Sequence, residues 1–384
     1  MKMITATRLE SVKEYYFSKK LREVAALIQQ GKPVLNMGIG SPDLPPHPSI
    51  VEALQAGLAH PKAHMYQSYQ GLPELRQAMA DFYQRNYAVD LDPNHEVLPL
   101  MGSKEGIMHI SMAFLNKGDE VLIPNPGYPT YSSVTQLVEA KPVFYNLTQD
   151  NGWQPDFEAL EQLDTYKIKI MWVNYPHMPT GAKASEETFE RLIRWAKKNE
   201  ILLVNDNPYS FILNDHPQSI LRFPGAKEVA LELNSLSKSF NMAGWRVGQL
   251  SGNAENIQAV LKVKSNMDSG MFYGIQQGAI AALNAPTSWF SELNATYKKR
   301  RNKVEHLASA MNTTFDPNSV GLFVWAKLND DSLAAENYID DILHQKNIFI
   351  TPGTIFGSQG EGYVRFSLCV NEDQIQTAIN RMKA

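Results

Sequence analysis

The sequence predicts an α/β fold: a large domain with a mostly parallel sheet sandwiched by helices, plus a smaller α+β domain. The main observation is that short apolar runs alternate with amphipathic segments through the middle of the chain. Lys169–Asn174 (KIMWVN) is followed by the helical pattern of Glu186–Asn199 and then by the apolar run Ile201–Val204. Strand, helix and strand in this rhythm favour parallel strands that are covered on both faces.

A change in pattern after about residue 285 indicates the smaller domain. A long charged helix to about residue 310 precedes strands near 320–328 and 361–370. The length of 384 residues suits two domains at roughly 100–200 residues each. We expect a large domain over 46–284 and a small domain formed by both chain ends, 1–45 and 285–384.

The individual elements follow from local patterns. A helix is expected at about 8–30, before a Gly/Pro loop at 36–49, and further strands at Asp119–Ile123 and Val229–Leu233. Within Glu186–Asn199, apolar residues recur at i, i+3, i+4 and i+7, the spacing that places them on one helix face: Phe189, Leu192, Ile193 and Ala196.

Composition excludes several classes of protein. The 36 basic and 40 acidic side chains leave a formal net charge of −4, and no run of five basic residues occurs. We therefore expect no nucleic-acid partner. No apolar window approaches the ~20 residues that span a bilayer, so we expect no membrane partner. The N-terminus does not resemble a secretory signal, and Cys369 is the one cysteine, which together predict a cytoplasmic protein without a metal site.

Polar residues follow three of the apolar runs. Asn174, Asp206 and Lys238 are spaced 32 residues apart, each just after a predicted strand. Ligands in open α/β sheets bind outside the carboxyl ends of the strands, so these side chains are candidates for one site. A single polar strand end carries little information, because strand ends are often polar for solubility, but three in register are far more specific.

The segment around Lys238, SLSKSFNMAGWRVG, combines two kinds of chemistry. A lysine that forms a Schiff base needs a desolvated, cation-rich setting that lowers its pKa. A phosphate needs hydroxyl groups, an arginine and backbone N–H groups at a helix start. Ser235 and Arg246 lie beside Lys238 in the sequence and could meet both needs. The competing interpretation is an ordinary surface lysine.

This segment resembles the lysine segment of the class I/II aminotransferases, which are fold type I pyridoxal phosphate enzymes. Further matching segments occur in the family's order, and the match extends from about Gly38 to Arg365: YQSYQGLPELR (66–76), GSKEGI (102–107), PNPGYPTY (124–131), NYPHMPTG (174–181), NDNPYS (205–210) and YVRFSL (363–368). Several of them look most like the LL-diaminopimelate aminotransferase branch, which also includes enzymes for other amino acids.

The resemblance implies roles around pyridoxal 5'-phosphate. Lys238 would hold the cofactor as an internal aldimine and move the proton between Cα and C4′. Asp206 would pair with the pyridinium nitrogen, and Tyr209 would donate a hydrogen bond to the phenolic oxygen. Taken alone, Asp206 could equally be a turn or helix-capping residue, and Tyr209 an ordinary half-buried tyrosine.

The resemblance also places the cofactor phosphate. It would bind Ser103 and Lys104 at the N-terminus of a helix expected over Lys104–Asn116, with Ser235 and Arg246 closing the site. Tyr128 would stack on the cofactor ring, although an aromatic residue in a Pro-rich turn is a fair alternative.

The remaining matches concern the substrate and a second subunit. Tyr66 matches a tyrosine that reaches the phosphate of the neighbouring subunit, which implies a homodimer. Arg365 would bind the substrate α-carboxylate through two parallel hydrogen bonds, and Ile39 and Gly40 would close over the substrate beside it. A surface arginine on an edge strand is the alternative for Arg365.

One position departs from the family pattern. The residue before Pro-Thr-Gly is usually Asn, whose amide binds the phenolic oxygen, but here it is Met178. A thioether is a weak acceptor and no donor. Asn174 could take over the bond, helped by His177, or Tyr209 could act alone.

The sequence therefore predicts an aminotransferase that moves an amino group from an L-amino acid to a 2-oxo acid through pyridoxamine phosphate. Two alternatives stay open: a C–S β-lyase on the same fold, and a non-catalytic binding or regulatory protein. Candidates for side-chain specificity are Tyr15–Phe17, His64 and the segment 268–273.

Overall fold

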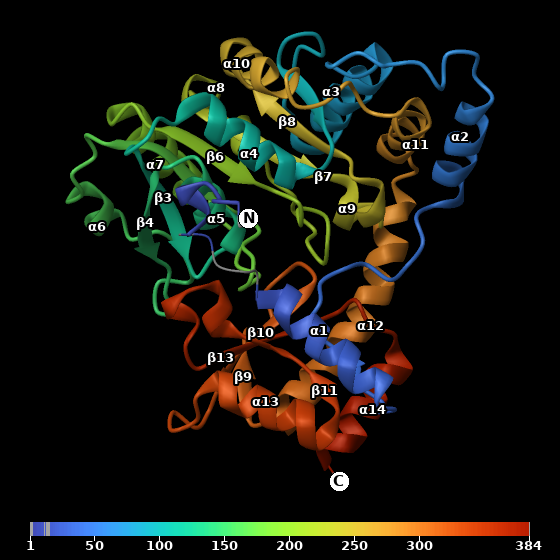
Figure 1. The fold of residues 1–384 in the computed structure, drawn as a ribbon, viewed down its shortest axis with the longest axis vertical. Helices are drawn as coiled ribbons and strands as arrows, with labels where there is room; N and C mark the ends of the chain where they lie inside the picture. The colour runs from blue at the N-terminus through green and yellow to red at the C-terminus, as the bar shows by residue number, and fades with distance from the viewer. Residues whose placement is uncertain (1–2, 11, 13–15, 384) are drawn as a thin grey trace.

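A seven-stranded sheet forms the centre of the computed structural model, which describes residues 3–10, 12 and 16–383 (Figure 1). The strands β7, β6, β5, β3 and β4 run parallel, and β8 runs antiparallel to β2 and β7 on either side of it. The mostly parallel sheet predicted from the sequence is thus confirmed. In spatial order the strands are β2 (Val97–Leu100), β8 (Gly248–Gly252), β7 (Ala230–Ser235), β6 (Leu202–Asp206), β5 (Ile168–Val173), β3 (Glu120–Asn125) and β4 (Lys141–Asn146).

Both faces of this sheet are buried, which explains why its strands read as continuous apolar runs. In β5, Ile170 and Trp172 belong to one apolar cluster, whereas Met171 and Val173 belong to another. Helices cover the two faces (Figure 1). Those in contact with its strands include α3 (Pro73–Tyr87), α4 (Ser103–Phe114), α5 (Pro129–Leu137), α7 (Glu186–Lys198), α8 (Ala226–Val229) and α10 (Ala254–Lys264). This part of the chain also contains α6 (Phe157–Glu161), α9 (Leu236–Ser239) and α2 (Pro48–Leu58), which packs against α11 (Tyr273–Leu283).

A second, antiparallel sheet lies among the chain ends, in the order β12 (Thr351–Pro352), β13 (Tyr363–Ser367), β10 (Phe323–Leu328) and β9 (Thr313–Phe315). The short strand β1 (Leu35–Asn36) pairs with β11 (Ile348–Phe349), so the N-terminal and C-terminal segments meet, as Figure 1 shows. The accompanying helices are α1 (Tyr16–Gln29), α12 (Ser288–Ala310), α13 (Ala335–Lys346) and α14 (Glu372–Lys383). The smaller α+β part is therefore confirmed, while the boundaries at 45/46 and 284/285 stay a prediction.

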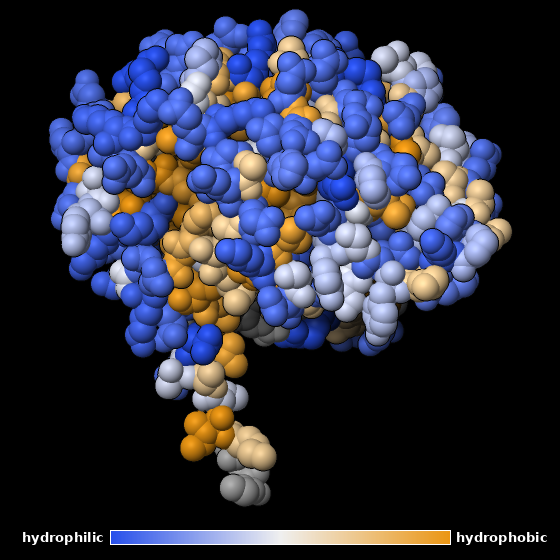
Figure 2. Space-filling model, turned by 90° about the horizontal axis from the view of Figure 1, so that it is seen from above, coloured by the Kyte–Doolittle hydropathy of each residue, from blue (hydrophilic) through white to orange (hydrophobic). Residues whose placement is uncertain are grey.

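Five 3₁₀ turns complete the described secondary structure: η1 (Thr7–Leu9), η2 (Ile220–Arg222), η3 (Ala243–Trp245), η4 (Gly353–Phe356) and η5 (Ser358–Gly360). The helix expected at 8–30 is shorter than predicted, because α1 is described from Tyr16 and residues 7–9 form η1. Met3 and Ile4 are exposed, and the N-terminal segment projects from the body of the molecule (Figure 2). A short helix gains most of its stability from packing, and this segment has little surface to pack against.

An ion pair between a buried arginine and a solvent-exposed aspartate ties the N-terminal loop to α12. The Arg300 guanidinium is almost fully buried and donates to both carboxylate oxygens of Asp43, at 2.6 and 2.9 Å, and also to the Leu368 carbonyl at 3.2 Å. The loop held in this way includes Gly40 and Ser41, which line the central cavity described below. Among the described residues, no helix is both long and apolar enough to cross a membrane.

We expect Asp43→Asn to lower the free energy of unfolding by about 1–3 kcal/mol, because the buried Arg300 charge loses its bidentate partner and keeps, among the described carboxylates, only Glu372, at 3.8 Å. Urea unfolding followed by tryptophan fluorescence measures the change. The matched control is Glu228→Gln, which removes the exposed partner of Lys197 and should cost less than about 1 kcal/mol. Equal costs for the two variants would contradict the proposed role of the Arg300–Asp43 pair.

Candidate active site

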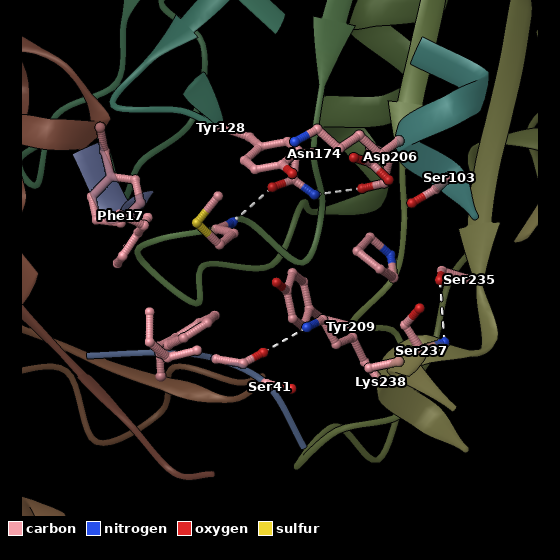
Figure 3. A pocket seen from close by; sticks show the side chains of 18 of the residues that line it. Phe17, Ser41, Ser103, Tyr128, Asn174, Asp206, Tyr209, Ser235, Ser237 and Lys238 are labelled. Carbon is pink, nitrogen blue, oxygen red and sulfur yellow. Dashed lines mark hydrogen bonds between the residues drawn. The ribbon is translucent and has the colours of Figure 1, made fainter. Parts of the chain in front are cut away.

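A cavity of about 400 Å³ opens at the carboxyl ends of the parallel strands, between the seven-stranded sheet and the segments from the chain ends. Figure 3 shows side chains from both parts pointing into it. Its lining includes twelve of the thirteen residues predicted from the sequence: Ile39, Gly40, Ser103, Lys104, Tyr128, Asn174, Asp206, Tyr209, Ser235, Lys238, Arg246 and Arg365.

Three neighbouring strands deliver the polar residues at the floor of this cavity. Asn174 follows β5, Asp206 ends β6 and Ser235 ends β7. Lys238 was expected directly after a strand, like Asn174 and Asp206. It lies three residues beyond β7, in the short helix α9. The convergence predicted from the 32-residue spacing is nevertheless present, because parallel strands end at one edge of the sheet.

Asp206 is the buried acid of the site. Its Oδ2 accepts a hydrogen bond of 2.8 Å from the Tyr131 hydroxyl, and its Oδ1 is buried without a hydrogen-bond partner among the described residues. Burial raises the pKa of Asp206 to about 6; the Tyr131 bond lowers this pKa, and the nearby Glu232 raises it. An orphaned carboxylate oxygen of this kind fits a ligand that brings an N–H donor. The alternative of a turn or capping aspartate is therefore wrong.

Tyr131 was missed in the sequence, although it closes the PGYPTY segment that contains Tyr128. Its ring stacks on Trp172, with centroids 4.9 Å apart, and its hydroxyl reaches Asp206 from α5. Only the packing of α5 on the sheet brings these groups together. A second tyrosine three residues after Tyr128, on the same helix face, is the signal that sequence reasoning could have used.

Lys238 is half-buried, and its Nζ donates a 2.6 Å hydrogen bond to the Gly40 carbonyl. Burial lowers the pKa of the Lys238 amine, and the charges of Arg365 and Arg246 lower it further. A lowered pKa provides the neutral amine that a nucleophilic lysine needs. An ordinary surface lysine does not have these surroundings.

One end of the cavity is built to bind an anion. Ser103 begins α4, and Ser235 and Ser237 lie on the same side of the cavity, as Figure 3 shows. Gly102 has a φ of +91°, and a Cβ there would collide with the Arg246 guanidinium. The helix start, the hydroxyls and the cations of Lys104 and Arg246 together suit a phosphate.

The opposite end holds Arg365, which is buried in β13 between β12 and β10, so it is not a surface residue on an edge strand. Its guanidinium lies 3.9 Å from the Phe323 ring centroid and 4.6 Å from that of Phe356. One of its nitrogens donates to the Gly38 carbonyl at 2.8 Å, and another lies 3.4 Å from the Met178 sulfur.

Of the two residues that could replace the amide missing at Met178, Asn174 lines the cavity and His177 does not. The Asn174 amide donates to the Asp206 carbonyl, its oxygen accepts from the Met178 N–H at 2.9 Å, and its side chain lines the cavity beside Asp206 (Figure 3). His177 instead bonds Thr180 and the Pro126 carbonyl, outside the cavity lining. The suggestion that His177 assists at this position is therefore wrong, because its ring nitrogens are used in the loop.

Some predicted residues lie away from the cavity of this subunit. Tyr66 is 91% exposed in the loop between α2 and α3, so its predicted service to a neighbouring subunit stays a prediction. Phe17 lines the cavity, whereas Tyr15 lies outside the described residues. His64 and the segment 268–273 do not line it.

Comparison with known proteins decides the family. The model of the aminotransferase class I and II family matches residues 32–382. The chain belongs to this family. An LL-diaminopimelate aminotransferase from Aquifex aeolicus is 39% identical over 98% of this chain and 97% of its own length.

Solved structures agree with this assignment. The substrate-bound BacF structure from Bacillus subtilis matches with a TM-score of 0.95 and 33% identity, over 100% of this chain and 98% of that one. An aromatic aminotransferase from Pyrococcus horikoshii matches with a TM-score of 0.86 and 27% identity, over 94% and 97%. The chain is thus an aminotransferase that depends on pyridoxal 5'-phosphate, with the fold type I architecture, and the orphaned Asp206 oxygen and the anion-binding end fit that cofactor.

A second polar cluster lies between α4 and the loop that joins α10 to α11. Glu105, His109 and Asp268 each bring a possible metal-ligand atom within 4.8 Å of the others. The Lys264 ammonium lies 2.9 Å from Asp268 and already compensates part of this charge. The expected lack of a metal site stays a prediction, which elemental analysis of the purified protein can check.

The pKa of Asp206 predicts how the stability of the cofactor-free protein depends on pH. The folded state keeps this proton up to about pH 6, whereas an unfolded aspartate loses it near pH ~3.9. The stabilising contribution is therefore complete below about pH 4 and is lost as the pH rises through about 6. We expect the unfolding free energy of wild type, relative to Asp206→Asn, to fall by about 3 kcal/mol between these limits.

Urea titrations at several pH values measure this difference. Asp81→Asn, which removes an exposed carboxylate from α3, is the control. A wild-type profile parallel to that of Asp206→Asn would show that the folded protein does not hold this proton.

Proposed function

We propose that this aminotransferase moves the amino group of an L-amino acid to a 2-oxo acid, with Lys238 as its catalytic residue. The observation that carries the proposal is one cavity that contains a lysine of lowered pKa, a buried carboxylate with an unused oxygen and an arginine at each end. Bound pyridoxal phosphate supplies an electron sink for charge that develops at the substrate Cα. The side chains then decide where protons and carboxylates are held.

Lys238, Asp206 and Tyr209 have the central roles in this proposal. The Lys238 amine holds the cofactor and moves the proton at the substrate Cα. The unused Asp206 Oδ1 would accept from the pyridinium N–H, while Tyr131 holds Oδ2 and fixes the plane of the carboxylate. The Tyr209 hydroxyl and the Asn174 amide would bind the phenolic oxygen, and Tyr128 would cover the ring.

The two ends of the cavity orient the reactants. Ser103, Lys104, Ser235 and Arg246 bind the phosphate, and Arg365 binds the α-carboxylate. Ile39 and Gly40 close over the substrate. They belong to the small domain in the proposed division (1–45 and 285–384 against 46–284), so an approach of this domain would exclude water from the site.

We further propose that the working unit is a homodimer. Exposed apolar side chains gather on two segments that touch each other, because Gly270 packs against the backbone of Gln67 and Ser68. A monomer rarely leaves such a patch in water, which supports an interface here. The patch is formed by Met65, Tyr66, Tyr69, Met267 and Phe272. Tyr66 would reach the phosphate site of the partner subunit from this patch.

The cytoplasm is the proposed location. The single cysteine, Cys369, is buried and cannot form an intrachain disulfide, which agrees with a reducing compartment.

Lys238→Ala tests the central role. We expect wild type with cofactor to absorb near the edge of the visible range and to transfer an amino group to phenylpyruvate or 2-oxoglutarate. The variant should lose both properties, because Lys104, the other amine in the described lining, lies at the phosphate end. Absorbance and the formation of phenylalanine or glutamate are measured together with pyruvate release from a β-thio amino acid. Elimination without transfer in wild type would favour the β-lyase; colourless wild type after incubation with cofactor would favour the non-catalytic alternative.

Tyr66→Ala tests the shared site. Alone, it should bind cofactor more weakly than wild type, because the phosphate loses a hydroxyl donor. At a cofactor concentration too low to load Tyr66→Ala alone, random mixing of Tyr66→Ala with Lys238→Ala subunits should restore about a quarter of wild-type activity, because half of the dimers then contain one complete site. Tyr166→Ala, which removes another exposed tyrosine, is the control. A mixture no more active than its components would contradict a Tyr66 contribution across the interface.

A further inference from the structure

We propose that the Arg365 end of the cavity is a subsite for a large uncharged amino-acid side chain, aromatic or methionine-like. The inference rests on the proposed function and adds the substrate class to it. The names of the relatives do not indicate one substrate class, since they cover both diaminopimelate and aromatic amino acids. The inference is drawn from the side chains that line the cavity of this chain.

Apolar groups surround Arg365. Phe17, Ile39, Met178, Phe323 and Phe356 line this part of the cavity, and we call these five residues the apolar end. Met178, Phe323 and Phe356 are each at most 6% exposed. Phe17 lies opposite Ser103 and Ser235 in Figure 3, so the apolar end is far from the phosphate end.

The charged lining residues are already assigned to other groups. Lys104 and Arg246 lie at the phosphate end, Asp206 lies at the cofactor nitrogen, and Lys238 is the catalytic amine. Arg365 is the single charged residue at the apolar end within the described lining. Its guanidinium lies against aromatic rings, at 3.9 Å for Phe323 and 4.6 Å for Phe356. In the proposed function it binds the α-carboxylate.

A substrate with a distal charge meets no matching group there. Diaminopimelate brings a second ammonium and a second carboxylate, and both would leave water for phenyl rings and a thioether. The Met178 sulfur has no hydrogen to donate and accepts only weakly. Burial of an uncompensated charge is far more costly than burial of apolar surface, which is favourable. The subsite should therefore disfavour amino acids with a charged group at the end of the side chain and favour those with a large apolar side chain.

The test uses the cofactor-loaded enzyme and single-turnover absorbance changes with separate amino acids. We expect phenylalanine, methionine and leucine to react with specificity constants roughly 100-fold or more above those of glutamate, lysine and LL-diaminopimelate. Binding without chemistry gives an independent measurement: 3-phenylpropionate should inhibit more strongly than glutarate. A preference for the charged amino acids and for glutarate would overturn the subsite and leave the proposed function intact. Failure of every amino acid to react would overturn the proposed function itself.

A substitution that adds a new substrate preference can show that Phe17 contacts the substrate side chain and does not only support the fold. Phe17→Lys places a cation at the apolar end and should shift the ratio of specificity constants, 2-aminoadipate over phenylalanine, at least about tenfold toward the diacid. Ile28→Lys adds the same charge at an exposed position of the same helix, α1, away from the cavity, and should leave the ratio unchanged. An unchanged ratio in Phe17→Lys, with cofactor still bound, would overturn the assignment.

Discussion

The buried carboxylate of Glu232 holds together the strand ends from which the site is built. Glu232 lies in β7 and accepts hydrogen bonds from the Tyr83 hydroxyl at 3.0 Å, the Asn205 amide at 2.9 Å and the Ile220 N–H at 3.0 Å. Asn205 in turn accepts from the Tyr175 N–H at 3.1 Å. Asn205 is next to Asp206 and Tyr175 is next to Asn174, and both of these neighbours line the cavity, so this carboxylate links the ends of β5, β6 and β7.

The same carboxylate influences the chemistry above it. Glu232 is fully buried, and burial raises its pKa, but its three donors favour the charged form. Burial raises the pKa of Asp206 to about 6, and the negative charge of Glu232 adds to this rise. The hydrogen bond from the Tyr131 hydroxyl lowers the same pKa. A cofactor N–H that fills the empty position on Asp206 would pair with a carboxylate whose other oxygen is already fixed. Asn205, which binds Glu232, and Asp206, which lines the cavity, are adjacent in β6. The carboxylate that links the strands therefore also affects the pKa of Asp206.

The chain ends supply what the large sheet lacks. Arg365 comes from β13, Gly40 from the loop after β1, and Phe17 from α1, and all reach the cavity because β1 pairs with β11 and Arg300 holds Asp43. The cavity consequently has a phosphate end built on the large sheet and an apolar end built mainly on the chain ends. This division separates the part that would bind the cofactor from the part that would choose the side chain.

The sequence by itself determined the large sheet and most of the site. Strands buried on both faces must be apolar throughout, as in KIMWV, and the polar residues after them stand out for that reason. Ordered motifs then located twelve residues that line one cavity. Tertiary structure alone decided three things: that Tyr131 reaches Asp206, that His177 turns away, and that Phe17, Met178, Phe323 and Phe356 converge on Arg365. These contacts join residues far apart in the chain through packed side chains. The spacing of Tyr128 and Tyr131 could have singled out a second tyrosine, but only the packing of α5 on the sheet brings its hydroxyl to Asp206.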